Sequence, residues 1–430
     1  MSDKIKLNPA VFLAIAIFII NSTIFSFLIY PKIEKGIDLN FDGEGYQKIA
    51  LNILSGKGFY FSEGDDPVLS SHGRPTLLRP PLYPYFISCV YYLFGFKPQI
   101  IVVCHVIINS LMIYFVYRIA KEVFNEKTAI LSSFICAFYL PFIWFLPRLY
   151  NENIFNFLLA CSMFYVVLVF CNLSLINSII LGILIGLASL CKGQMILFPF
   201  VLLPGLIYRY RGEKTKFCKH YAIILLTFLL SLSPWVIRNY IVSEKFVPAQ
   251  CGGAIHFMRG NESAKMNIGF FHQNHGIAMK KAFEKEEQII EKFESLNKRK
   301  ITEVELDEIF NKIAFNYIKE NPIEFLEKIR IGCLHFWYLG ESKIKSMGMA
   351  LLQFPVLILA LLGFYLALKK RIKCIFPFYS VILYFTLVHA AILPISRYSI
   401  PIMPYIIIFA SFGIITLYNK LKEILQSDLV

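Results

Sequence analysis

The sequence predicts an all-α polytopic membrane protein. Of its 430 residues, 57% are hydrophobic and only 17% are charged. A soluble chain of this length would need far more polar residues to cover its surface. Several uncharged runs approach or reach the ~20 residues that a helix needs to cross a bilayer. These observations exclude a soluble globular protein.

The net charge of +14 does not indicate a nucleic-acid-binding protein. The basic residues cluster between apolar runs, as they do in cytoplasmic loops of membrane proteins, and no basic recognition module appears. The ten cysteines are scattered, without CxxC pairs or Cys/His spacings typical of metal sites. Cys251 and Cys333 both fall in a long polar region and are candidates for a disulfide.

The apolar runs predict about ten transmembrane helices, within a range of nine to twelve. The first run, Val11–Tyr30, follows Lys4 and Lys6 and lacks a small-residue cleavage site, so it reads as a retained helix. The predicted spans are residues 11–30, 99–119, 128–146, 153–171, 174–191, 194–208, 219–237, 348–368, 374–394 and 398–418.

The orientation follows from the basic loops. With the N-terminus inside and ten spans, Tyr208–His220 ("YRYRGEKTKFCKH") and Lys369–Lys373 ("KKRIK") both fall in the cytoplasm. A further apolar segment, Arg79–Phe96 ("RPPLYPYFISCVYYLFGF"), is ambiguous between a span and an interfacial helix. An eleventh span there would turn the basic loops outward. We therefore expect Arg79–Phe96 to lie in the membrane interface.

Two long segments remain outside the membrane in this arrangement, within a single membrane domain covering residues 1–430. The first outer loop, residues 31–98, is expected to carry interfacial helices. The second segment, residues 238–347, is expected to be mainly helical, because Thr302 and Glu305 form a capping box ahead of helically spaced apolar residues. That helix is expected to end before Pro322.

Charged residues gather on the predicted outer face, where the positive-inside tendency does not require cations. Each residue has a simpler explanation: Arg238 and Arg397 can extend to lipid headgroups, Glu152 can pair with Arg148, and Asp42 can cap a short helix. The group comprises Asp42, Glu44, His72, Arg74, Arg79, Arg148, Glu152, Lys192, Arg238 and Arg397.

Together these residue types suit transfer of a sugar from a lipid-linked donor. Guanidinium and ammonium groups beside the bilayer hold a lipid phosphate. A nearby carboxylate removes the proton from an attacking hydroxyl, a general-base role worth ~10²–10⁴ in rate.

The chain resembles the polytopic GT-C glycosyltransferases. Within them, it resembles the branch that contains the polyprenyl-phosphate-mannose protein mannosyltransferases and the bacterial aminoarabinose transferases. The matching motifs follow the order of the family across residues 40–410. They are "DGEGYQKIALNILSGKGF", "RPPLYPYFISCVYYLFG", "NEKTAILSSFICAFYLPFIWFLPRLYNEN", "GLASLCKGQMILFPF", "PWVIRNY", "FNYIKENPIEFLEKI" and "SRYSIPIMPYIII".

The resemblance implies a GT-C-like bundle with an outer-face cavity that admits a lipid tail. It implies that Asp42 is the general base and that Glu152 is a second catalytic acid, which shares that role or positions the acceptor or a metal. Arg79 and Lys192 would face the donor phosphate. The full set of implied substrate-binding residues is Glu44, Tyr46, His72, Arg79, Tyr83, Lys192, Arg238, Arg397 and Tyr398.

The sequence also departs from the family. The protein mannosyltransferases carry neighbouring Asp and Glu residues, whereas here Glu44 lies two residues after Asp42. No large globular domain is evident, which argues against a eukaryotic-type protein mannosyltransferase and leaves the acceptor as a lipid, a glycan or a protein.

We expect an inverting hexosyl- or pentosyltransferase in the plasma membrane, acting on its extracytoplasmic face. The alternative is a transporter or flippase of lipid-linked sugars, which would bind the same phosphate without chemistry. Few ionisable residues fall inside the spans, which disfavours the transporter. No cofactor is required. We also expect no metal. The alternative is a divalent metal ion held by Asp42 and Glu152, with loop histidines such as His256.

Overall fold

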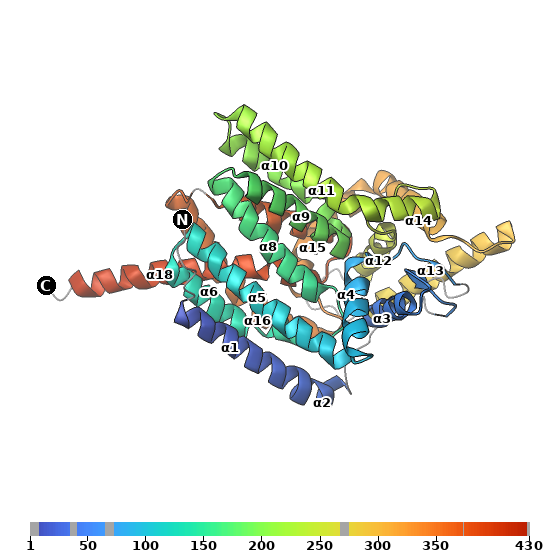
Figure 1. Ribbon diagram of the computed structural model, residues 1–430, viewed down its shortest axis with the longest axis horizontal. Helices are drawn as coiled ribbons and strands as arrows, with labels where there is room; N and C mark the ends of the chain where they lie inside the picture. The colour runs from blue at the N-terminus through green and yellow to red at the C-terminus, as the bar shows by residue number, and fades with distance from the viewer. Residues whose placement is uncertain (1–7, 35–40, 65–72, 267–274, 373, 428–430) are drawn as a thin grey trace.

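The protein is an almost entirely helical membrane bundle, as predicted (Figure 1). The structure is a computed structural model, and it describes residues 8–34, 41–64, 73–266, 275–372 and 374–427. One short antiparallel strand pair, β1 (Tyr60–Phe61) and β2 (Arg74–Pro75), lies in the first outer loop. The fold is that of an integral, multi-pass membrane protein.

Within the described residues, six helical segments are long and apolar enough to cross a bilayer. They are α1 (Pro9–Ile24) continued by η1 (Phe25–Ile29) and α2 (Tyr30–Glu34); α5 (Pro98–Val123); α8 (Glu152–Cys171); α11 (Lys214–Ser243); α16 (Lys343–Lys369); and η3 (Ser396–Ile402) with α18 (Met403–Ser427). In Figure 1, α18 follows the longest axis of the molecule, whereas α1, α5, α8 and α11 run obliquely to it.

Shorter apolar helices occupy the remaining predicted spans, so each span has a helix at its place. They are α6 (Glu126–Phe138) with α7 (Leu140–Trp144), α9 (Leu175–Cys191), η2 (Gly193–Leu197) with α10 (Phe198–Arg209), and α17 (Phe376–Ala391). The segment 238–347 is mainly helical, as expected, with α12 (Gly253–Met266), α13 (His275–Asn297), α14 (Glu303–Glu320) and α15 (Pro322–Tyr338).

The predicted span 128–146 is not one continuous helix. It breaks at Tyr139, which is extended, and resumes as the short helix α7. The reason is Pro141, which has no N–H to donate to the carbonyl of Ala137 and whose ring would collide with that carbonyl in a helix. The break ends α6 at Phe138 and starts α7 at Leu140.

The ambiguous segment of the first outer loop forms α4 (Leu82–Phe94). Its 13 residues rise about 20 Å, well short of the roughly 30 Å hydrocarbon core. Figure 1 shows α4 running across the end of the bundle, beside α3 (Phe41–Leu54), whereas α5 and α8 run along it. This arrangement agrees with an interfacial helix.

Burial separates central from peripheral helices. Nearly every residue of α8 is buried, and so is α18 from Met403 to Phe412. In contrast, α1, α11 and α16 expose large apolar side chains on their outer faces, such as Phe12, Leu229 and Leu351. A helix that is apolar all round packs one side on protein and presents the other to lipid.

Two glycines bring α9 and α11 into close contact. A Cβ at Gly182 would lie 2.4 Å from the carbonyl oxygen of Ile224, and one at Gly186 would lie 2.5 Å from the Cβ of Ser231. The spacing Gly-x-x-x-Gly is a common device for close helix packing in membranes. It packs the middle of α9, the helix that leads to Lys192, closely against α11.

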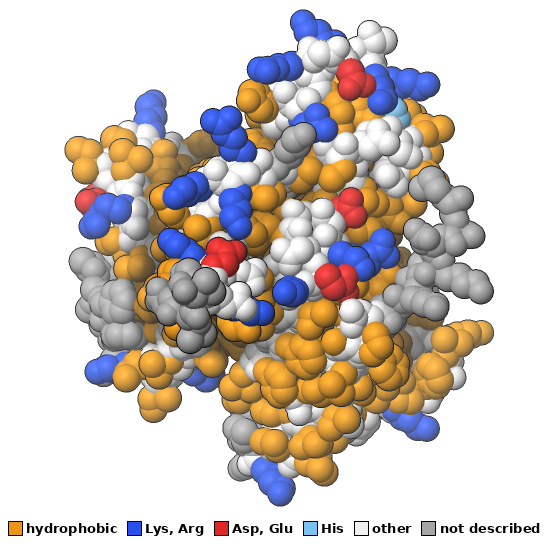
Figure 2. Space-filling view, turned by 90° about the vertical axis from the view of Figure 1, so that its left-hand side faces the viewer, with side chains coloured by type: hydrophobic (Ala, Val, Ile, Leu, Met, Phe, Trp, Pro, Cys, Tyr) orange, Lys and Arg blue, Asp and Glu red, His pale blue; other side chains and the backbone are white. Residues whose placement is uncertain are grey.

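The loops predicted to be cytoplasmic lie at one end of the bundle. This is the left-hand end in Figure 1, near the C-terminal end of α18. Seen from that side, Lys and Arg far outnumber Asp and Glu on the surface (Figure 2). The segments α3, α4 and α12–α14 lie at the opposite end (Figure 1).

The two outer segments are joined through a buried carboxylate at the start of α14. Glu303 accepts hydrogen bonds from Arg74 Nε (2.9 Å), Thr76 Oγ1 (2.9 Å) and the Leu77 amide. The predicted capping box of Thr302 is present one residue earlier. The first outer loop is therefore fastened to α14.

The candidate disulfide between Cys251 and Cys333 is not formed, and both residues carry free thiols. Cys251 packs with Leu77 and Val247 in a small apolar cluster, whereas Cys333 belongs to α15. Through this cluster, Cys251 packs against Leu77 of the first outer loop.

Candidate functional site

Three turns from distant parts of the chain meet at the carboxylate of Glu152. Lys192 Nζ donates to Glu152 Oε1 at 2.8 Å, and Arg397 donates from Nε to Oε1 at 2.7 Å and from Nη2 to Oε2 at 2.9 Å. Glu152 is only 2% exposed. This direct contact agrees with the prediction that the three turns lie at the same end of the bundle.

The turn before α8 is shaped by asparagine side chains. Asn153 Nδ2 donates to the carbonyls of Phe145, Arg148 and Tyr150, which lie in the turn just before it. Asn151 Nδ2 donates to the carbonyl of Cys191, next to Lys192. These bonds satisfy buried backbone acceptors and hold the Glu152 turn against the Lys192 turn.

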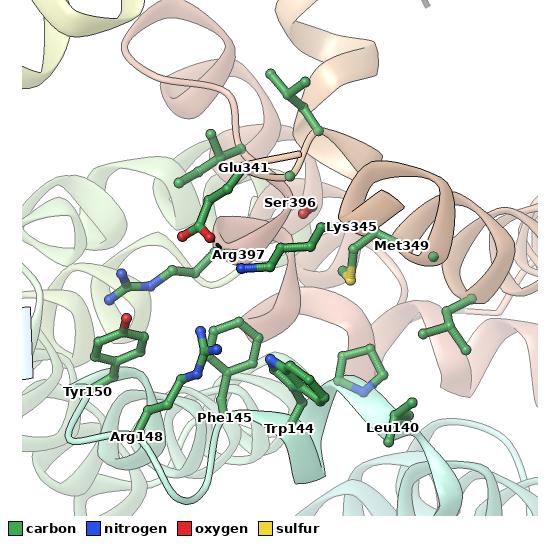
Figure 3. Close-up of a pocket in the computed structure, with 16 residues that line it drawn as sticks. Leu140, Trp144, Phe145, Arg148, Tyr150, Glu341, Lys345, Met349, Ser396 and Arg397 are labelled. Carbon is green, nitrogen blue, oxygen red and sulfur yellow. Dashed lines mark hydrogen bonds and ion pairs between the residues drawn. The ribbon is translucent and has the colours of Figure 1, made fainter. Parts of the chain in front are cut away.

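Arg148 lies in an aromatic environment on the other side of Tyr150. Its Nε donates to the hydroxyl of Tyr30 at 3.1 Å, and its guanidinium lies 5.7 Å from the Trp144 ring centre. The guanidinium of Arg397 stacks on Tyr150 at 3.9 Å, and that of Arg148 lies 5.9 Å from the same ring. Tyr150 thus separates two cations at this site (Figure 3).

A cavity of about 270 Å³ opens beside these cations. Figure 3 shows Arg148, Arg397 and Lys345 together at one part of it, with Trp144 and Leu140 from α7 farther along. The lining therefore changes from charged to apolar. The remaining lining residues are Pro141, Phe145, Tyr150, Leu339, Gly340, Glu341, Gly348, Met349, Leu352, Ile395 and Ser396.

The first outer loop contributes an aromatic layer near Glu152. The guanidinium of Arg79 lies 5.1 Å from the Tyr46 ring centre, and Tyr46 makes an edge contact with Tyr83 at 5.0 Å. The Tyr83 hydroxyl is 3.1 Å from Nε2 of His105. Burial, with Tyr46 and Glu152 nearby, raises the pKa of Tyr83 well above its ordinary value, so this hydroxyl keeps its proton.

The predicted base, Asp42, lies in the first turn of α3, and its side chain is outside what the structure describes. Three residues on, Gly45 lies beside Arg79, since a Cβ there would be 3.7 Å from Arg79 Nη2. Glu44 is exposed and forms an ion pair with Lys48 on the same helix at 2.9 Å. His72 lies outside the described residues.

Two other predicted residues have different surroundings. Arg238 donates to the backbone carbonyls of Thr76 (2.8 Å) and Phe59 (2.9 Å), so its described contacts fix the first outer loop. Tyr398 lies with its ring centre 5.2 Å from Lys192 Nζ, so it belongs to the Glu152 site. The role of Arg238 at the donor phosphate stays a prediction.

Part of the chain matches a known family. Residues 78–237 match the family model described as dolichyl-phosphate-mannose-protein mannosyltransferase. The matched stretch contains Arg79, Tyr83, Glu152 and Lys192. Over this stretch, which is less than half of the chain, the predicted resemblance to the polyprenyl-phosphate-mannose protein mannosyltransferases is confirmed.

Solved structures show the same fold. The oligosaccharyltransferase AglB from the archaeon Archaeoglobus fulgidus, solved with an inhibitory peptide and a dolichol-phosphate, superposes with a TM-score of 0.59 at 13% identity. The match covers 98% of this chain and 51% of that one. The apo form of the A. fulgidus enzyme gives a TM-score of 0.61 at 13% identity, covering 97% of this chain and 52% of that one.

The chain therefore spans about half the length of these oligosaccharyltransferases. ArnT from Cupriavidus metallidurans, bound to undecaprenyl phosphate, matches at 12% identity over 94% of this chain and 77% of that one. Its TM-score of 0.41 is too low to support a conclusion about the fold. No curated protein matches the sequence.

Sequence reasoning missed several residues of the cavity. Arg148 belongs to the charged residues of the predicted outer face, but the resemblance implies no substrate role for it, and its aromatic partners have no signal in the sequence. Lys345 and Glu341 stand in "GESKIK", which reads as the solvated start of a helix. Only the fold brings that start beside Arg148 and Arg397.

Among the described residues, no cluster of three or more His, Cys, Asp or Glu side chains is placed to hold a metal ion. The buried carboxylate of the site, Glu152, is engaged by two cations. His256 lies on α12, and the Asp42 side chain is outside the described part of the chain. A metal at Asp42 stays an untested alternative.

A buried lysine in the second outer segment gives a testable pH dependence. Lys328 on α15 is 4% exposed, donates to Asn261 Oδ1, and lies 4.1 Å from the Phe257 ring centre. Burial lowers the pKa of Lys328 to about 7. The folded chain therefore binds this proton more weakly than the unfolded chain, in which the lysine pKa is about 10.4.

Because of this difference, the contribution of Lys328 to stability is expected to rise as the pH rises from about 7 towards 10. The measurement compares unfolding of the wild type and of Lys328→Met in detergent from pH 6 to pH 9. The wild type should gain stability relative to the variant over this range. An unchanged difference would contradict the prediction, and Lys319→Met, at an exposed position of α14, is the control.

Proposed function

We propose that this protein is an inverting glycosyltransferase that moves a sugar from a polyprenyl-phosphate donor to an acceptor hydroxyl. The observation that carries the proposal is the cavity beside Glu152, whose lining changes from Arg148, Arg397 and Lys345 to apolar side chains of α7 and α16. A lipid phosphate has the matching division between a charged head and an apolar chain. Guanidinium groups are well suited to such a phosphate.

The Glu152 site supports an electrostatic role for that residue. Two cations engage its carboxylate, so it orients Arg397 and Lys192 and offsets part of their charge. With Arg148 added, and with Lys345 paired to Glu341, the site keeps a positive balance suited to an anion. We therefore assign the base to Asp42 and the positioning of cations to Glu152.

In the proposed reaction, Asp42 accepts the proton of the acceptor hydroxyl as its oxygen attacks the anomeric carbon. The bond between that carbon and the phosphate oxygen breaks, and its electron pair stays on the departing lipid phosphate. Arg148, Arg397 and Arg79 stabilise the charge that develops there. Attack opposite to the leaving group inverts the configuration.

The reaction is assigned to the extracytoplasmic face of the plasma membrane. The basic surface of Figure 2 lies at the end of the bundle opposite α3 and α4, and positive loops favour the cytoplasm. The segments 31–98 and 238–347 would then both lie outside, within one GT-C-like membrane domain. The AglB structure that shares this fold was solved with a dolichol-phosphate and a peptide, which supports a lipid-phosphate donor.

Lipid binding gives a direct test. The purified protein should bind undecaprenyl phosphate more tightly than undecaprenol, which lacks the phosphate. Arg148→Met should weaken binding of the phosphate about ten- to hundredfold, because a hydrogen bond to a charged group is worth about 1.5–3 kcal/mol. The measurement is a binding titration in detergent, with Arg211→Met, exposed at the basic end, as the control. Equal affinity for the phosphate and the alcohol would overturn the proposal.

The same protein in proteoliposomes separates transfer from transport. With a labelled undecaprenyl-phosphate sugar and a cell-envelope extract as the source of acceptors, a transferase moves the label from the lipid to another molecule. A flippase moves the intact labelled lipid between leaflets. Label that remains on the lipid while it crosses the bilayer would favour the transporter.

A further inference from the structure

The cavity carries a second carboxylate besides the buried Glu152. Glu341 lies just before α16, and its carboxylate accepts from Lys345 Nζ at 2.6 Å. Both side chains line the cavity together with Arg148 and Arg397. Figure 3 shows the Glu341 carboxylate lying between the Lys345 ammonium and the side of the cavity where Arg397 lies.

The two carboxylates differ in how firmly they are engaged. The side chain of Glu152 is 3% exposed and contacts two cations, whereas those of Glu341 and Lys345 are 70% and 48% exposed. An ion pair this exposed contributes little stability, because water competes for both charges. Lys345 can therefore leave Glu341 and bind a phosphate with little loss of free energy. The negative charge of Glu341 then lies close to the negative charge of that phosphate.

The proposed substrate and product differ in charge at this place. The donor is a phosphodiester with one negative charge, whereas the released polyprenyl phosphate is a monoester that carries about −1.5 to −2 at neutral pH. Repulsion from a fixed carboxylate grows in proportion to the charge of the ligand. Glu341 thus acts about twice as strongly on the product as on the donor.

We propose that Glu341 is a specificity-determining residue that weakens binding of the product lipid phosphate relative to the donor. This inference rests on the proposed function. It explains why a cavity rich in cations carries a solvated carboxylate. Without it, the more highly charged product would compete with the donor for the same cations, and release of product often limits turnover in enzymes.

The test uses two lipids that differ by one methyl group on the phosphate, and therefore in charge: undecaprenyl phosphate and its monomethyl phosphodiester. At pH 8, Glu341→Gln is expected to tighten binding of the diester about threefold and that of the monoester about sevenfold, taking the two charges to be about 7 Å apart in a water-like dielectric. At pH 5 the monoester is also singly charged, so the difference between the two lipids should disappear.

Matched variants distinguish this role from a local structural one. Glu327→Gln removes another exposed carboxylate that is paired on its own helix, with Arg330 at 2.8 Å, and should change neither affinity. Lys345→Met should weaken both lipids, the monoester more than the diester. Equal tightening of both lipids by Glu341→Gln, or none, would overturn the inference while leaving the proposed function standing. Failure of both lipids to bind the wild type would overturn both.

Discussion

Asp42→Asn is expected to reduce sugar transfer by about 10²–10⁴, the usual contribution of a general base. The asparagine keeps the size of the side chain, but it cannot accept the proton of the acceptor hydroxyl. Binding of undecaprenyl phosphate should change little, because the cations of the cavity are intact. The measurement is the initial rate of label transfer together with the lipid affinity.

A control for this variant is Glu63→Gln, in the exposed turn after β1 of the same loop. It should retain full transfer. The comparison also bears on the alternative metal, since added Mn²⁺ or Mg²⁺ would not restore a missing base. Normal transfer by Asp42→Asn would remove Asp42 from the mechanism and leave the base unassigned.

Glu152→Gln is expected to lower the free energy of unfolding by about 3–5 kcal/mol, the cost of breaking a buried ion pair by removing one partner. The change leaves Arg397 and Lys192 close together without their shared carboxylate. The measurement is denaturant-induced unfolding in detergent. Transfer should also fall, because Arg397 loses the bidentate contact that orients it.

The double variant Glu152→Gln/Lys192→Met should recover part of this stability, because only one buried cation then lacks its partner. Glu213→Gln removes an exposed carboxylate that pairs with Lys216 at 3.2 Å, and should cost less than about 1 kcal/mol. Equal stability of Glu152→Gln and Glu213→Gln would show that the buried ion pairs of Glu152 contribute little to the free energy of folding.

The sequence predicted that Glu152, Lys192 and Arg397 share one end of the bundle, because the count of spans and the basic loops determine where each turn lies. It did not predict that both cations bind the same carboxylate. The pairing of Glu152 with Arg148, considered from their closeness in sequence, differs from the contacts observed. Which cation reaches a buried carboxylate depends on helix packing, such as the glycine contacts between α9 and α11.

Other features had no signal in the sequence. An arginine at the end of a membrane helix, such as Arg238, looks the same whether it reaches lipid headgroups or the carbonyls of a loop. The aromatic surroundings of Arg148 include Tyr30, which lies 118 residues away along the chain. Pro141 indicates the break before α7, but the continuous uncharged run from Ala129 to Leu146 favours a single span.

That break has a consequence for how a long lipid would reach the cations. Because α6 ends at Phe138, the apolar part of the cavity includes Leu140, a residue that is 43% exposed. Under the proposed function, a donor would therefore enter the cavity laterally from the bilayer, and most of its isoprene chain would stay in the surrounding lipid. The protein would then bind the phosphate and the first few carbons of the lipid, and its affinity would not depend on the length of the chain.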